Sequence, residues 1–186
     1  MVKISKFILF KLSFICILFI TSCSEAEESK QKKTKPSFEL VKIPQVNQDS
    51  VFSFVQKQVD FGPRVPNSEA HKQCADWMVK KLNDYNFKTI EQKGVQLAHD
   101  GKKLAYRNII GRFGLDKKKR ILLSAHWDTR PWADQDVERV NEPIDGANDA
   151  GSGVAVILEI ARVLNLKYPS IGVDVVLFDI EDYGKS

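Results

Sequence analysis

Apolar residues recur at helical spacing directly after residue 46. Asn47 begins a cap-rich stretch that can start a helix, and the inner face of that helix would carry Phe52, Val55 and Val59. A proline-rich stretch interrupts this pattern, and Ser68 can then cap a second helix. The inner face of the second helix would carry Ala70, Cys74, Trp77, Met78 and Leu82.

The segments that follow have the pattern of strands. Residues 87–97 and 103–113 lie on either side of Asp100 and Gly101, a pair that is typical of a hairpin turn. The sequence therefore predicts two antiparallel strands here.

The rest of the chain alternates between strand and helix. Short apolar runs at 120–125 and 173–178 predict buried strands, and the helical pattern of 151–166 lies between them. A strand, a helix and a strand in this order form a crossover unit with parallel strands. We therefore expect an α/β fold.

The N-terminal 22 residues have the pattern of an export signal. Lys3 and Lys6 are followed by an apolar run that is short for a membrane span. The run ends in Ile20-Thr-Ser-Cys23, which resembles a bacterial lipobox, so we expect residues 1–22 to be a lipoprotein signal peptide and Cys23 to be lipidated. An ordinary signal peptide or an uncleaved anchor, with Cys23 incidental, is the alternative.

Three regions follow from this interpretation. After the signal peptide, residues 23–46 are polar, lack apolar periodicity at their start and are expected to form a tether. Residues 47–186 would form the folded body of the chain, the N-terminal half of a larger domain. The expected location is lipid-anchored outside the cytoplasmic membrane, facing the periplasm or at the cell surface.

Charge and cysteine content narrow the class of function. The formal net charge of the 186 residues is +4, but Lys3, Lys6 and Lys11 belong to the leader, and the rest is close to neutral. A nucleic-acid-binding domain usually carries a strongly basic patch, so no nucleic acid is expected as a partner. Cys74 is the one cysteine in the body of the chain, so we expect a small buried residue and no internal disulfide.

Three acid-rich segments stand where an α/β sheet forms a site. Residues 126–128 and 179–182 directly follow the two predicted parallel strands, and residues 145–153 precede the helix between them. Sites in open α/β sheets form beyond the carboxyl ends of the strands. Histidine and carboxylates suit zinc, and a carboxylate beside a ligand could carry protons.

Each of these residues has a plainer interpretation when it is taken alone. Asp149 could cap the helix, Asp182 could be a solvated loop residue, and His126 could be a hydrogen-bonded core residue. Glu181 alone is uninformative. Their combination at the ends of adjacent strands is much harder to explain by accident.

The same segments resemble a known family. The runs 124–134 (Ser-Ala-His-Trp-Asp-Thr-Arg-Pro-Trp-Ala-Asp), 146–153 (Gly-Ala-Asn-Asp-Ala-Gly-Ser-Gly) and 178–184 (Phe-Asp-Ile-Glu-Asp-Tyr-Gly) resemble metallopeptidase family M28, which includes zinc aminopeptidases and glutaminyl cyclases. The first run and residues 62–71 resemble the bacterial glutaminyl-cyclase-like branch. The resemblance implies a three-layer sandwich whose mixed, mostly parallel central sheet is flanked by helices.

The resemblance also implies roles for single residues. Asp149 and Asp182 match the family's acidic zinc ligands, although the second position is usually Glu in the family. Glu181 matches the acid–base carboxylate. His126 matches a residue that binds a second metal in the two-zinc aminopeptidases and lies near the site in the one-zinc cyclases, and Asp128 matches its orienting neighbour.

The implied activity is that of a zinc-dependent glutaminyl-peptide cyclotransferase. One zinc ion would assist cyclisation of peptides with N-terminal glutamine to pyroglutamate, with release of ammonia. Family members continue beyond the Glu-Asp motif to a distal histidine ligand, so we expect this chain, which stops at Ser186, to be the front half of the domain and inactive alone. A two-zinc aminopeptidase of the same fold and a truncated, non-catalytic lipoprotein that serves as a binding module are the alternatives.

Overall fold

The computed structural model describes residues 43–184. The expected signal peptide, Cys23 and most of the tether lie outside these residues. The last tether residues, 43–46, are exposed and have no regular secondary structure. No helix within residues 43–184 is both long enough and apolar enough to span a membrane.

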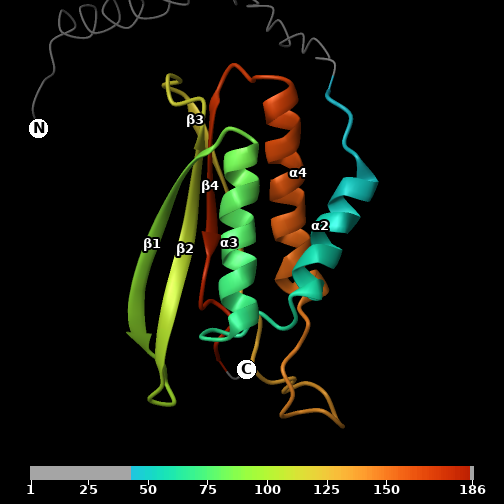
Figure 1. Ribbon diagram of the computed structural model, residues 1–186, viewed down its shortest axis with the longest axis vertical. Helices are drawn as coiled ribbons and strands as arrows, with labels where there is room; N and C mark the ends of the chain where they lie inside the picture. Colours follow the sequence, from blue (N-terminus) through green and yellow to red (C-terminus); the bar gives the residue numbers. More distant parts are fainter. Residues whose placement is uncertain (1–42, 185–186) are drawn as a thin grey trace, which may run out of the picture. The chain divides into compact units, whose positions relative to one another are not determined.

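The described residues form one compact unit of helices and strands (Figure 1). The strands begin and end close to the positions that the apolar pattern predicts. The predicted helix at 151–166 begins two residues later as α4 and is preceded by the short turn η1. The elements in chain order are α2 (Gln48–Asp60), α3 (Glu69–Asp84), β1 (Lys88–Leu97), β2 (Lys103–Phe113), β3 (Arg120–His126), η1 (Ala147–Ser152), α4 (Gly153–Leu166) and β4 (Gly172–Phe178).

The four strands form a mixed sheet in the order β1-β2-β4-β3. Strand β3 pairs with β4 in parallel, as the crossover through α4 requires. The β1–β2 and β2–β4 pairs are antiparallel. The expected mixed sheet with flanking helices is therefore confirmed, but among the described strands the parallel pairs do not predominate. The reason is that β1 and β2 form a hairpin, whose second strand pairs antiparallel with β4.

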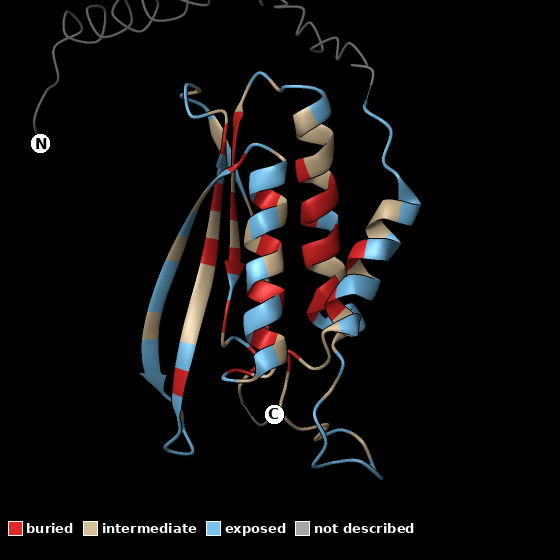
Figure 2. Ribbon diagram, viewed as in Figure 1, coloured by how far each residue is buried: buried red, intermediate tan, exposed pale blue. Residues whose placement is uncertain are grey.

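Helices α3 and α4 cover one face of the sheet, and the core lies between (Figure 2). Met78 and Leu82 of α3 and Leu158 of α4 are fully buried against alternate residues of β2 and β4. The opposite face carries Leu122, which is 63% exposed, and the half-exposed Phe178. Residues 43–184 thus contain two of the three layers that the resemblance implied.

The predicted residues Asn47 and Ser68 cap α2 and α3, but the buried face of α2 differs from the prediction. Asn47 Oδ1 accepts hydrogen bonds from the amides of Asp49 and Ser50. Phe52, expected on the inner face of α2, is 69% exposed, and Phe54 and Gln58 are buried instead. This face is turned inward because α2 packs against α4 and η1 and not against the sheet. A glutamine is tolerated there because its Nε2 donates to the carbonyl of Gly151 at 2.9 Å.

A buried carboxylate joins α4 to the start of α2. Glu159 is 2% exposed, accepts two hydrogen bonds from Arg162 at 2.6 and 2.7 Å, and accepts a third from the amide of Asn47 at 2.7 Å. The Arg162 guanidinium, followed by the Asn47 amide, lowers the pKa of Glu159 against the effect of burial. The charged form is therefore the one that the fold stabilises.

We expect Glu159→Gln to lower the free energy of unfolding by about 1–3 kcal/mol at pH 7, because the amide loses charge-assisted hydrogen bonds. Since the pKa of Glu159 is lowered by folding, this contribution is present above the ordinary pKa of glutamate and is lost as the pH falls through the lowered value. Urea denaturation from pH 7 downward measures it, with the exposed Glu138→Gln as the control. Equal unfolding free energies of wild type and Glu159→Gln at pH 7 would contradict this role.

Candidate active site

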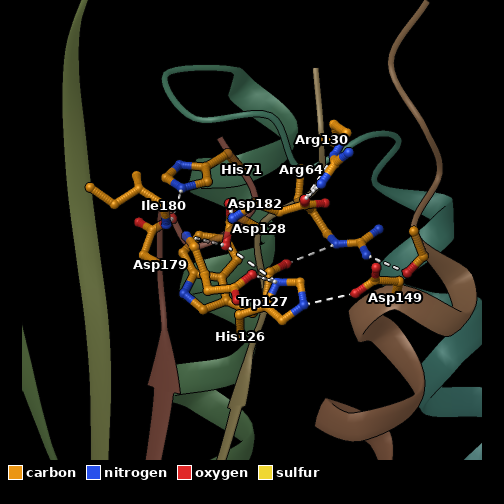
Figure 3. A network of polar contacts seen from close by, with 12 residues as sticks. Arg64, His71, His126, Trp127, Asp128, Arg130, Asp149, Asp179, Ile180 and Asp182 are labelled. Atoms are coloured by element: carbon orange, nitrogen blue, oxygen red, sulfur yellow. Dashed lines mark hydrogen bonds and ion pairs between the residues drawn. The ribbon is translucent and has the colours of Figure 1, made fainter. Parts of the chain in front are cut away.

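A buried arginine organises the backbone around the site (Figure 3). Arg64 lies in the bend between α2 and α3 and has no exposed surface. Its Nε donates to the carbonyl of Trp127 at 3.2 Å, and its Nη1 and Nη2 donate to the carbonyls of Asp145 and Gly146 at 2.6 and 2.7 Å. Burial lowers the pKa of Arg64. One side chain thus ties the segment after β3 to the segment before α4.

The segment before α4 makes a tight turn that requires glycine. Gly146 has a φ of +60°, a conformation that residues with a Cβ rarely adopt. A Cβ there would collide with the side chain of Thr129 and lie 2.6 Å from the carbonyl oxygen of Asp149. Asp149 follows with an extended backbone, a φ of −104° and a ψ of 103°.

The carboxylate of Asp149 contacts a histidine and not the helix. Its Oδ1 lies 2.8 Å from Nε2 of His126 at the end of β3. The N-cap position of α4 belongs to Ser152, and no side chain caps it. The helix-cap alternative for Asp149 is therefore wrong. The side chain of Asp149 is 67% exposed, so its carboxylate remains accessible.

His126 stands among three carboxylates. Besides Asp149, its Nδ1 lies 3.5 Å from Oδ1 of Asp128 and 3.7 Å from Oε2 of Glu181. Asp128, and after it Asp149, raise the pKa of His126 to about 9 against the effect of partial burial. Without a metal, His126 is therefore cationic at neutral pH and balances part of the negative charge of the site.

Asp128 positions the loop that follows β4. Its carboxylate is fully buried, and it accepts hydrogen bonds from the amides of both Glu181 and Asp182, each at 3.1 Å. The same carboxylate lies beside His126. The orienting role that the resemblance implied for Asp128 thus has a structural basis on two sides.

Asp182 is buried and held by an arginine. Its Oδ1 accepts a hydrogen bond from Nε of Arg130 at 2.8 Å and lies 2.8 Å from Nη2 in an ion pair, and Nη1 of Arg130 also binds Asp134. The alternative of a solvated loop residue is therefore wrong for Asp182, which is 6% exposed. The side chain of Glu181, by contrast, is 63% exposed.

The end of β4 is fixed from behind the site. Asp179 Oδ1 lies 2.8 Å from Nε2 of His71 on α3, and Asp179 Oδ2 accepts from the amide of Arg107 at 2.6 Å. The ring of His71 stacks on Trp127 with 4.3 Å between centroids. These contacts hold the β4 terminus, from which Glu181 and Asp182 extend.

Asp149 and Asp182 line the same cavity, which has a volume of about 450 Å³. The other lining residues are Arg130, Trp132, Ala133, Asp134, Gln135, Asp136 and Ile144. The two predicted zinc ligands thus line one cavity. His126 lies beside Asp149. The amide of Glu181 is bound by Asp128.

The residues fit a metal in one specific respect. Asp182 Oδ2 is buried and has no hydrogen-bond partner within the described residues. An unpartnered buried carboxylate oxygen is costly in a protein, and a cation removes that cost. Residues 43–184 nevertheless contain no group of three His, Cys, Asp or Glu side chains placed to hold a metal. Catalytic zinc usually has three protein ligands, so Asp149 and Asp182 alone would leave such a site one ligand short.

Sequence reasoning missed residues whose role is to position others. Arg64 and Arg130 lie within the stretches that carry the resemblance, yet nothing in their spacing shows which groups they contact. An aromatic cluster was also missed: the ring centroids of Trp132 and Tyr183 are 5.5 Å apart, and His99 of the hairpin turn lies 6.3 Å from Tyr183. Buried Cys74 is as predicted.

We expect Arg64→Lys to destabilise the protein by about 3 kcal/mol, because an ammonium group cannot reach three separate carbonyls and would leave buried acceptors without donors. Urea denaturation at pH 7 measures this, with Arg139→Lys, whose side chain is 68% exposed, as the matched control. A loss no larger than that of the control would show that Arg64 does not hold these segments.

Comparison with known proteins agrees with this geometry. Residues 108–186 match the model of peptidase family M28. The structure is similar to a glutaminyl cyclase from Tannerella forsythia, with 49% identity and a TM-score of 0.75 over 76% of this chain and 50% of that one. It is also similar to a Zn-dependent exopeptidase from Parabacteroides distasonis, with 48% identity and a TM-score of 0.75 over 77% of this chain and 50% of that one.

A third similar structure is the glutaminyl cyclase of Bacteroides thetaiotaomicron bound to N-acetylhistamine. It is 48% identical, with a TM-score of 0.75, over 77% of this chain and 50% of that one. The chain thus spans about half the length of each of these proteins. Residues 108–186 match peptidase family M28, and the fold of the described residues matches that of bacterial glutaminyl cyclases and zinc-dependent exopeptidases.

Proposed function

We propose that the whole protein is a zinc-dependent glutaminyl-peptide cyclotransferase that acts on peptides with N-terminal glutamine. The observation that carries the proposal is that Asp149 and Asp182 line one cavity while Glu181, accessible to solvent, extends from the same loop as Asp182. Similarity to two bacterial glutaminyl cyclases at 48–49% identity supports it.

The carboxylates of Asp149 and Asp182 would hold one zinc ion in this proposal. Bound zinc supplies Lewis acidity toward the γ-carbonyl oxygen of the glutamine side chain. Asp182 offers its unpartnered Oδ2, and Asp149 offers an exposed carboxylate. His126 would lie beside the metal ligand Asp149, from which its Nε2 is 2.8 Å away.

Glu181 would move the proton. The hydrogen bond from its amide to Asp128 fixes its backbone, while its side chain is 63% exposed and lies 3.7 Å from Nδ1 of His126. Glu181 would take a proton from the α-amine as the amine nitrogen attacks the carbonyl carbon of the side-chain amide, and it would give that proton to the amide nitrogen, whose bond to this carbon breaks to release ammonia. Cyclisation needs no activated water, so one zinc ion suffices.

A two-zinc aminopeptidase is the second candidate. The 2.8 Å contact between His126 and Asp149 favours it, because an imidazole beside a carboxylate ligand could hold a second zinc. The similar exopeptidase of Parabacteroides distasonis supports the same possibility. An aminopeptidase would contain two zinc ions per chain and release free N-terminal residues, whereas a cyclase would contain one and release ammonia.

In the whole protein, we expect Glu181→Gln to lower the rate of ammonia release from glutaminyl peptides by about 10²–10⁴-fold without loss of zinc, since an amide of the same shape cannot carry a proton. Asp182→Asn should lose zinc instead, because the variant lacks a ligand carboxylate. Both quantities are measured on purified wild type and variants.

The control is Glu138→Gln, an exposed glutamate of the loop after β3, which should keep full activity and zinc. If Glu181→Gln stays fully active, or loses zinc while Asp182→Asn retains it, the assigned roles are wrong. If zinc-loaded wild type shows no turnover with glutaminyl peptides or aminopeptidase substrates, a non-catalytic binding module is favoured.

We also propose that lipidated Cys23 anchors the protein outside the cytoplasmic membrane. The support is the Ile20-Thr-Ser-Cys23 ending of the apolar leader. Cys23→Ser should abolish incorporation of labelled fatty acid and release the protein from the membrane fraction. Equal labelling of wild type and Cys23→Ser would refute the anchor.

A further inference from the structure

Arg130 contacts only one of the two carboxylate oxygens of Asp182. Nε of Arg130 donates to Oδ1 of Asp182 at 2.8 Å, and Nη2 lies 2.8 Å from the same oxygen, so the guanidinium contacts one oxygen only. The other oxygen, Oδ2, is buried and has no donor within residues 43–184. A guanidinium facing a carboxylate commonly binds both oxygens in a fork, so this arrangement leaves one oxygen available.

The arginine itself is held in place from both sides. Its Nη1 donates to both oxygens of Asp134, at 3.0 and 3.2 Å, and its backbone carbonyl accepts from the amide of Ile144 at 3.2 Å. Asp134, and after it Asp182, raise the pKa of Arg130. The amide of Asp182 is bound separately by Asp128. Both the backbone and one carboxylate oxygen of Asp182 are thus fixed independently of any metal.

We infer that Arg130 is a positioning residue that makes Asp182 a ligand through one oxygen, Oδ2, and thereby favours zinc over larger cations such as calcium. This inference rests on the proposed zinc site. Zinc takes few ligands in tetrahedral geometry, whereas calcium takes six to eight oxygens and often both oxygens of a carboxylate. By occupying Oδ1, Arg130 denies a calcium ion the second oxygen. It also fixes a side chain that is one methylene shorter than glutamate.

The alternative role for Arg130 is simple charge neutralisation, and it predicts the opposite result. If Arg130 only balanced the negative charge of the cavity, its removal would tighten the binding of every cation. If it positions Asp182, its removal weakens zinc binding and leaves calcium binding as strong or stronger. If its loss only disorders the cavity, both metals bind more weakly in parallel.

The test uses metal-free whole protein and the variants Arg130→Gln and Arg130→Lys. Arg139→Gln is the matched control, since it removes a positive charge from the same loop at an exposed residue that contacts Asp136. Zinc affinity is measured by competition with a chromophoric chelator, and calcium affinity by calorimetry. Thermal unfolding of each metal-free variant confirms the fold.

We expect Arg130→Gln to lose about 10–100-fold in zinc affinity with no loss in calcium affinity, as is typical when a partner of a metal ligand is removed. Arg130→Lys should also lose zinc affinity without losing calcium affinity, because a lysine keeps the positive charge but not the planar guanidinium. Arg139→Gln should match wild type.

Three results would overturn the inference: tighter zinc binding by Arg130→Gln, wild-type affinity in Arg130→Lys, or parallel loss of both metals. In those cases the proposed function stands as long as wild type binds zinc. If wild type binds no zinc, the proposed function and this inference fall together.

Discussion

The geometry of the candidate site depends on one buried guanidinium. Arg64 binds the carbonyls of Trp127, Asp145 and Gly146, which belong to segments on either side of the loop between β3 and α4. His126 precedes one anchored carbonyl and Asp149 follows the others. Because a buried arginine must satisfy its donors, these carbonyls have little freedom to move apart. The 2.8 Å contact between His126 and Asp149 is a consequence of that restraint.

Around this anchor, acidic side chains with similar chemistry take different roles because their surroundings differ. Asp128 is fully buried and binds two backbone amides, so it organises the loop. Asp182 is buried but has one oxygen free, which suits a metal ligand. The side chain of Glu181 is 63% exposed, which suits a group that meets a substrate. In the proposed function, burial and hydrogen bonding, more than residue type, thus separate structural support, metal binding and proton transfer.

Much of this arrangement could be predicted from the sequence, because local patterns determine it. The apolar runs of β3 and β4 predicted where the strands end, and topology then placed residues 126–128 and 179–182 at one edge of the sheet. The inward face of α2 could not be predicted, because it depends on packing against α4 and η1. There the side chain of Gln58 donates a hydrogen bond to the carbonyl of Gly151. The pairing of Arg130 with Asp182 likewise depends on a contact between residues 52 apart in the chain.

We propose that Asp149 and Asp182 form one zinc site at the cavity that they share. The most direct test is a crystal structure of the whole protein with zinc, with the metal located by anomalous scattering at the zinc edge. We expect a zinc peak about 2.0–2.2 Å from an Asp149 oxygen and from Oδ2 of Asp182, with Oδ1 still bound to Arg130. A zinc ion bound elsewhere, with Oδ2 of Asp182 still unpartnered, would contradict it.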